Sequence, residues 1–98
     1  MEIVTMDELR EILTDLQNIE IKAINIMRLI REPQCNPDLF GKSADTIMGI
    51  QFKIRDFRGI LSRNAGGFKR LDFLDFKEYA FSTLDYLQEA ALPIHQHN

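Results

Sequence analysis

The chain has 98 residues, a net charge of −3 and a hydrophobic content of 45%. This length is enough for one domain with a single buried core, and the composition excludes disordered and fibrous proteins. Its one cysteine, Cys35, excludes an intrachain disulfide and fits a reducing compartment. The sequence has no apolar run of about 20 residues, as a membrane span needs, and its first residues, MEIVTMDE, do not resemble a signal peptide. We therefore expect a cytoplasmic protein with no membrane partner.

The most regular pattern predicts a helix over residues 5–31. Its apolar residues recur at alternating steps of three and four, which keeps them on one stripe of a helix that faces a partner. These residues are Leu9, Ile12, Leu16, Ile19, Ala23, Ile26 and Ile30. Thr5 and Glu8 have the spacing of a capping box at the start of this helix, and Pro33 predicts its end near Arg31.

Two further helices are predicted after a loop. Residues 32–42 hold two prolines and a glycine without a helical period, which indicates a loop. The second helix is predicted over 43–64 with Ser43 as its N-cap, and the third over 72–92 with Asp72 or Asp75 as its cap. The expected core residues are Ile47, Ile50, Ile54, Phe57 and Leu61 on the second helix, and Phe73, Phe76, Ala80, Leu84, Leu87 and Ala91 on the third. Residues 94–98 are expected to form a disordered tail.

These elements predict an all-α fold, a three-helix antiparallel bundle that makes residues 1–98 a single helical domain. At a rise of 1.5 Å per residue, the first helix would be about 40 Å long and the other two about 32 Å. The first helix would then extend beyond its neighbours, with part of its apolar stripe uncovered. That uncovered stripe needs either the long loop or a second subunit, and it is the first of two reasons to expect a self-associating protein, a homodimer.

Charge is distributed unevenly along the chain. Residues 1–32 carry a net charge of −3, residues 33–70 carry +4 and residues 71–98 carry −4. Attraction between neighbouring helices of one bundle explains this pattern, and a basic face for an anionic partner is the alternative.

Four large side chains lie outside the predicted core stripes. Met48 and Phe52 are four residues apart on the side of the second helix opposite Ile50, and Tyr79 and Tyr86 share one flank of the third helix. Such faces either are enclosed because the second helix is central in the bundle, or they contact another chain. We treat Met48, Phe52, Tyr79 and Tyr86 as a predicted protein-interaction surface, which is the second reason to expect a homodimer.

Glu20 lies inside the apolar arc of the first helix at 100° per residue. An unpaired buried carboxylate is costly, so three arrangements are open to it. It reaches solvent at the edge of the arc, it pairs with Lys53 or Arg58 of the second helix, or it awaits a base from an incoming partner. The third arrangement adds Glu20 to the predicted interaction residues.

The connection 63–70, with sequence RNAGGFKR, is a candidate anion site. Adjacent glycines let backbone N–H groups turn toward a ligand, and a helix N-terminus favours negative charge. A plain turn is the competing interpretation, because Asp72 and Asp75 already supply negative charge to the helix dipole. The residues of this candidate site are Arg63, Gly66, Gly67, Lys69 and Arg70.

The sequence contains no recognisable nucleophile arrangement, and its histidines stand together in the tail without further predicted metal ligands. We therefore expect no enzyme activity, no metal and no cofactor. A pI near 5.3 and basic residues spread around the second helix argue against nucleic-acid binding. The predicted function is interaction with another protein, as an adaptor, regulator, inhibitor or immunity-type protein. The alternative is an anion- or nucleotide-binding module that uses residues 63–70.

Overall fold

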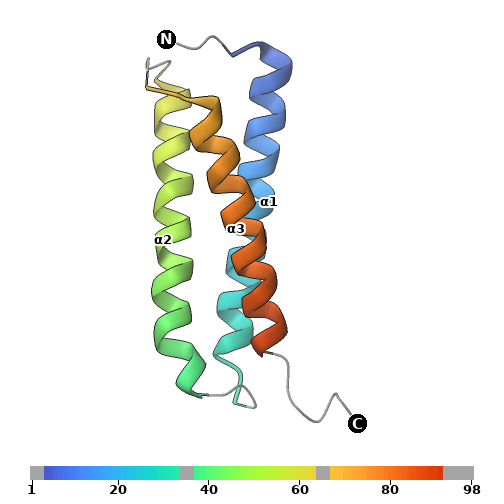
Figure 1. Ribbon diagram of the computed structural model, residues 1–98, viewed down its shortest axis with the longest axis vertical. Helices are drawn as coiled ribbons and strands as arrows, with labels where there is room; N and C mark the ends of the chain where they lie inside the picture. The colour runs from blue at the N-terminus through green and yellow to red at the C-terminus, as the bar shows by residue number, and fades with distance from the viewer. Residues whose placement is uncertain (1–3, 34–36, 64–66, 92–98) are drawn as a thin grey trace.

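The structure, a computed structural model, describes residues 4–33, 37–63 and 67–91. Within these ranges the chain forms three α-helices and no strand: α1 (Met6–Ile30), α2 (Pro37–Ser62) and α3 (Arg70–Ala91). α2 runs antiparallel to both other helices, so α1 and α3 are parallel to each other (Figure 1). The predicted all-α fold of three packed helices is confirmed.

The start of α1 is set by a capping box. The Thr5 hydroxyl oxygen accepts a hydrogen bond from the Glu8 N–H at 3.1 Å, and the Glu8 carboxylate accepts one from the Thr5 N–H at 3.3 Å. Asp7 and Glu8 place negative charge in the first turn, and Arg28 places positive charge in the last turn. The helix ends at Ile30, so its bounds follow from local sequence signals.

The start of α2 corrects the prediction. α2 begins at Pro37, six residues before Ser43, because proline is favoured at the first helical position, where its missing N–H is not needed. Ser43 lies inside the helix and is buried, so it is not an N-cap. α1 has 25 residues, α2 has 26 and α3 has 22, so α1 is not longer than α2 and exceeds α3 by three residues, which is less than one turn. The predicted difference in length between α1 and both neighbours is therefore wrong, and with it the first reason for self-association.

The start of α3 also lies earlier than predicted, at Arg70 and not at Asp72. Phe68 and Phe73 occupy the positions of a hydrophobic staple, one residue before the cap and four residues after it, with ring centroids 6.3 Å apart. Phe68 is buried, although it lies in the predicted connection 63–70 and was not among the expected core residues. The predicted helix end at residue 92 and the tail 94–98 lie outside the described residues.

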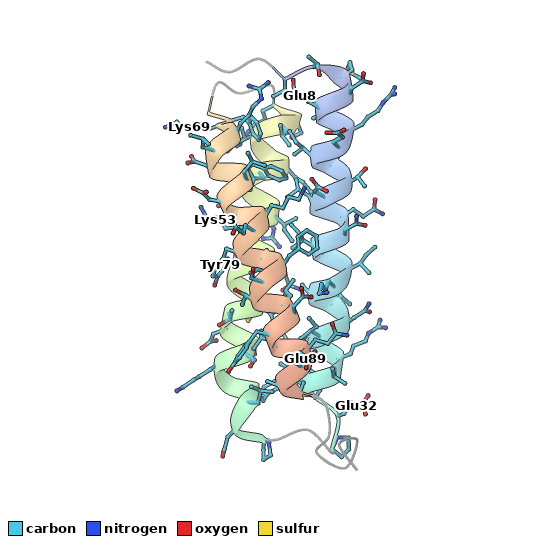
Figure 2. The ribbon with its side chains drawn as sticks, turned by 45° about the vertical axis from the view of Figure 1, so that its right-hand side comes forward. Glu8, Glu32, Lys53, Lys69, Tyr79 and Glu89 are labelled. Atoms are coloured by element: carbon cyan, nitrogen blue, oxygen red, sulfur yellow. The ribbon has the colours of Figure 1, made fainter. Side chains whose placement is uncertain are left out.

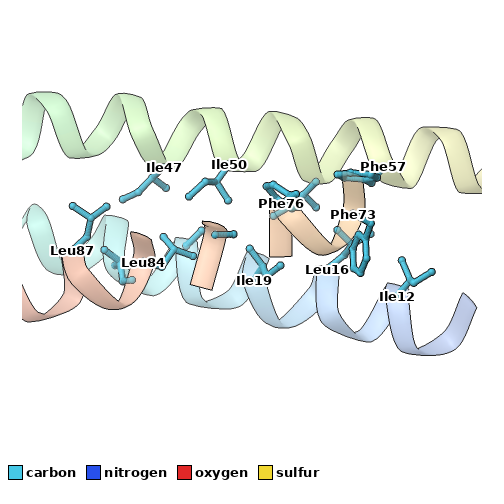
Figure 3. Close-up of a cluster of buried hydrophobic side chains, with 14 of the residues drawn as sticks. Ile12, Leu16, Ile19, Ile47, Ile50, Phe57, Phe73, Phe76, Leu84 and Leu87 are labelled. Atoms are coloured by element: carbon cyan, nitrogen blue, oxygen red, sulfur yellow. The ribbon is translucent and has the colours of Figure 1, made fainter. Parts of the chain in front are cut away.

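One cluster of buried side chains runs along the bundle axis (Figure 3). The predicted core residues of all three helices are buried, except Leu9 and Leu61, which are half-buried. At one end the Phe57 ring packs against Phe73 and Phe76, with centroid distances of 5.5 and 5.4 Å. α2 and α3 contact each other less than either contacts α1, so the bundle is least closed between α2 and α3.

Ion pairs join α1 to both other helices. On the α1–α3 side the pairs are Glu8 with Arg70, Asp15 with Lys77, and Lys22 with Asp85. The α1 members are seven residues apart, so these pairs follow one another along the parallel helices. On the α1–α2 side Glu20 pairs with Arg58. The Glu8 and Glu20 pairs each join the acidic first segment to the basic middle one, which supports attraction between helices as the origin of the charge pattern. No helix in the described part of the chain is both long and apolar enough for a membrane span.

Candidate functional site

The outer face of α2 is open. Met48 is 46% exposed and Phe52 is 55% exposed, so neither α1 nor α3 covers them. The Arg55 guanidinium lies over the Phe52 ring, with its carbon 5.6 Å from the ring centroid, in a cation–π contact. The predicted core residues of α2 lie on the opposite side of the helix. α2 is therefore two-sided in its apolar residues, with one side uncovered.

A groove lies between α2 and α3, built from two adjoining hollows of about 530 Å³ each. Lys53 and Asp72 line both hollows, which makes the groove continuous. We call the hollow beside the 63–70 connection the upper hollow and the other the lower hollow. The lower hollow is also lined by Thr46, Gly49, Ile50, Asp75, Phe76 and Tyr79. We call the whole feature the α2–α3 groove. Figure 2 shows Lys69, Lys53 and Tyr79 one below another on this side of the bundle.

The two tyrosines of α3 are exposed to different extents. Tyr79 is 54% exposed and lines the lower hollow, whereas Tyr86 is 70% exposed. The seven-residue separation of these residues places them on the same flank of α3. An exposed tyrosine offers a large apolar ring with a hydroxyl at its end, a combination frequent in protein interfaces.

The upper hollow contains part of the predicted anion site and two further bases. Arg63, Gly67 and Lys69 line it together with Lys53 and Arg55. Gly66 lies outside the described residues. Lys53 and Arg55 were not predicted as part of the site, although a helical spacing signal was present for Lys53. Lys53, Asp56, Ile60 and Arg63 recur at steps of three and four, which places them on one side of α2.

Arg70 points elsewhere. Its guanidinium donates hydrogen bonds to the two carboxylate oxygens of Glu8, at 2.8 and 3.0 Å. These hydrogen bonds, followed by that from the Thr5 N–H, lower the pKa of Glu8 from 4.5 to about 2. Arg70 therefore acts in the contact between α1 and α3 and does not line the upper hollow.

Glu20 adopts the internal pairing among its three predicted arrangements. The Arg58 guanidinium donates to its two carboxylate oxygens at 2.8 and 3.1 Å. The side chains are 39% and 38% exposed, so the pair lies at the edge of the core. A hollow of about 360 Å³ borders it, lined also by Ile24 and Gln51. The Glu20 carboxylate is thus held by Arg58 of the same chain.

Within the described ranges, no group of three or more histidine, cysteine, aspartate or glutamate side chains is placed to hold a metal ion. Cys35, His95 and His97 lie outside those ranges. Comparisons with protein-family models, with curated proteins and with solved structures each find no match to this chain.

Proposed function

We propose that this protein acts through protein–protein interaction, as a non-catalytic adaptor, regulator, inhibitor or immunity-type protein, and that it self-associates. One observation carries the proposal: Met48, Phe52, Tyr79 and Tyr86 remain between 46% and 70% exposed after the three helices have packed. Met48 and Phe52 are neighbours on the outer face of α2, Tyr79 and Tyr86 share a flank of α3, and neighbouring apolar residues that a fold leaves exposed are typical of interaction sites. Their burial against a second chain would contribute about 25 cal/mol for each Å² of apolar surface removed from water.

Two separate surfaces are available for two kinds of contact. The outer face of α2, with Met48 and Phe52, suits a second copy of the chain. The α2–α3 groove, with Tyr79, suits a different protein, because a helix laid there would complete a bundle of four helices. Lys53 and Asp72 in the middle of the groove, with Asp75 in the lower hollow, favour a partner segment that combines apolar side chains with both acidic and basic ones.

Gly49 provides a test of the groove that leaves the core intact. A Cβ added at Gly49 would meet nothing within 4 Å, so Gly49→Leu would project into the groove. The control is Gly49→Ala, which removes the same glycine from α2 and leaves the groove open. Each substitution should favour the helix by about 0.5–1 kcal/mol, so a loss of binding cannot come from unfolding.

The measurement is quantitative affinity capture from the source cells with wild type and the two variants as bait. We expect one partner protein that wild type and Gly49→Ala retain and Gly49→Leu loses. Equal recovery of every captured protein by all three baits would contradict a partner in the groove.

Self-association is tested at the outer face of α2. Light scattering at micromolar concentration should give a mass near twice 11.4 kDa for wild type. Met48→Asp combined with Phe52→Asp should lower the mass to that of one chain, with helicity unchanged by circular dichroism. Leu71→Asp is the matched control, because Leu71 is 73% exposed on α3, away from this face. If the control and the double variant have equal masses, Met48 and Phe52 have no role in self-association.

A specific observation supports anion binding as a second candidate function. Four bases, Lys53, Arg55, Arg63 and Lys69, line the upper hollow against two acids, Asp56 and Asp72. A hollow of about 530 Å³ lies within the usual size range of small-ligand pockets. A compact polyanion such as triphosphate or a nucleoside triphosphate would match this positive charge.

Thermal denaturation with inorganic triphosphate and with ATP tests this second function. A ligand at 100 times its Kd should stabilise the fold by about 2.7 kcal/mol. Arg63→Ala with Lys69→Ala should remove the gain, whereas Arg31→Ala with Lys42→Ala, at the opposite end of the bundle, should keep it. If neither anion increases the thermal stability of the protein, the upper hollow is not an anion site and is only a part of the α2–α3 groove.

A further inference from the structure

The outer face of α2 carries a heptad pattern of its own. Six residues recur at alternating steps of four and three, and at 100° per residue they fall within about 80° of arc. They are Gly41, Asp45, Met48, Phe52, Arg55 and Gly59, and we call them the outer seam. All are exposed except Gly59, which is half-buried with the Arg63 guanidinium beside it. The core of this chain does not explain the pattern, because α2 packs through its opposite side.

The outer seam is complementary to itself when a second α2 lies on it in the opposite direction. With a twofold axis at the level of Ile50, Met48 of each copy faces Phe52 of the other. Asp45 of each copy then faces Arg55 of the other. A twofold contact repeats each pairing, so the centre is apolar and an ion pair flanks it on both sides.

Both ends of the seam are glycines that face each other in the same arrangement. Gly41 of one copy lies opposite Gly59 of the other, and a Cβ at Gly41 would meet nothing within 4 Å. Gly41 presents no side chain at its level, whereas the Arg63 guanidinium lies beside Gly59, 3.5 Å from the position of an added Cβ. The glycines fall in the same register as the apolar and charged pairs.

Other arrangements of two α2 helices fit less well. A parallel pair in register places Asp45 against Asp45 and Arg55 against Arg55, which sets like charges opposite each other. An antiparallel pair can also be shifted by one heptad in either direction along the helix. One shift places Met48 against Asp45, and the opposite shift places Phe52 against Arg55. Only the arrangement centred at Ile50 pairs apolar with apolar and acid with base.

We infer that a second copy of this chain docks antiparallel on the outer seam, with Asp45 of each copy paired to Arg55 of the other. This inference rests on the self-association proposed above and assigns its surface, direction and register. A contact made by one helix pair buries less than the roughly 1,200 Å² of a typical stable interface. We therefore expect dissociation in the micromolar range.

Charge reversal tests the register, with sedimentation velocity as the readout. Asp45→Arg alone and Arg55→Asp alone each place like charges opposite one another twice, so each should raise the dimer dissociation constant at least about tenfold. An equimolar mixture of the two variants restores opposite charges at both positions and should form a heterodimer near the wild-type affinity. The double variant Asp45→Arg/Arg55→Asp should form a homodimer of similar affinity.

The controls make the same charge changes away from the seam. Glu78→Arg on α3 and Arg10→Asp on α1 replace exposed residues and should leave the dissociation constant within about twofold of wild type. Circular dichroism of every variant should show unchanged helicity.

The outcomes separate the register from self-association itself. A dimeric wild type whose single variants dimerise equally well would overturn the outer seam and leave self-association standing. If the single variants dimerise weakly and their equimolar mixture does not form a heterodimer near the wild-type affinity, the antiparallel register is overturned. A wild type that stays monomeric throughout would overturn both proposals.

Discussion

Arg58 of α2 donates two hydrogen bonds to Glu20 of α1, at 2.8 and 3.1 Å. The planar guanidinium binds both carboxylate oxygens, a geometry that constrains direction as well as distance. Arg58 stands on one flank of α2, so the pair restricts rotation of α2 against α1. The buried Ile47, Ile50, Ile54 and Phe57 set which side of α2 faces the core, and Met48 and Phe52 lie on the other side.

A double-mutant cycle on Glu20 and Arg58 should show a modest coupling. Both side chains are more than a third exposed, and solvent therefore screens the interaction. We expect Glu20→Ala and Arg58→Ala to be coupled by about 0.5–1 kcal/mol in urea denaturation. Independent, additive effects of the two substitutions would show that the pair contributes nothing to the stability of the fold.

The Glu8–Arg70 pair should make stability depend on pH in the acid range. The folded-state pKa of Glu8 is lowered from 4.5 to about 2, chiefly by the hydrogen bonds from Arg70. The ionised carboxylate therefore stabilises the fold above pH 4.5, and this contribution is lost as pH falls from about 4.5 to about 2. Glu8→Gln should flatten the dependence of the unfolding free energy on pH in that window.

A matched control for this measurement is Glu11→Gln, which removes an exposed carboxylate three residues farther along α1. The control should retain the wild-type slope between pH 4.5 and 2. If Glu8→Gln and Glu11→Gln give the same slope, the carboxylate held by Arg70 does not control acid stability.

Leu16 and Leu13 form a matched pair for testing the core face of α1. Leu16 is fully buried, and Leu16→Ala should cost about 2–5 kcal/mol because it removes apolar contacts and leaves a cavity. Leu13 is 40% exposed, and Leu13→Ala should cost less than about 1 kcal/mol. Urea denaturation with unchanged m-values gives both quantities. If Leu13→Ala lowers the unfolding free energy more than Leu16→Ala does, α1 faces the core with its Leu13 side and the assigned core face is wrong.

Local signals in the sequence predicted α1 and the core stripes. The capping box of Thr5 and Glu8 lies within four consecutive residues, and the heptad steps define the buried face without knowledge of the partner helices. The same periodicity identified Met48 and Phe52 as lying opposite the core of α2. The structure adds that neither neighbouring helix reaches that side.

The errors arose where two signals competed or where the partner lay far along the chain. Ser43 is a favoured N-cap residue, but Pro37 can occupy the first helical position and the chain uses the earlier start. Arg70 belongs by sequence to the basic connection, yet Glu8, 62 residues away, binds its guanidinium. The α2–α3 groove depends on how closely two helices pack, which residue spacing does not specify.

We propose that the chain functions by contact with other chains, and first of all with a second copy of itself. Sedimentation velocity of the unmodified protein across the micromolar range tests this most directly. We expect the weight-average mass to rise with concentration from 11.4 kDa toward twice that value. A mass that stays at 11.4 kDa at every concentration would contradict self-association and leave the exposed Met48 and Phe52 unexplained.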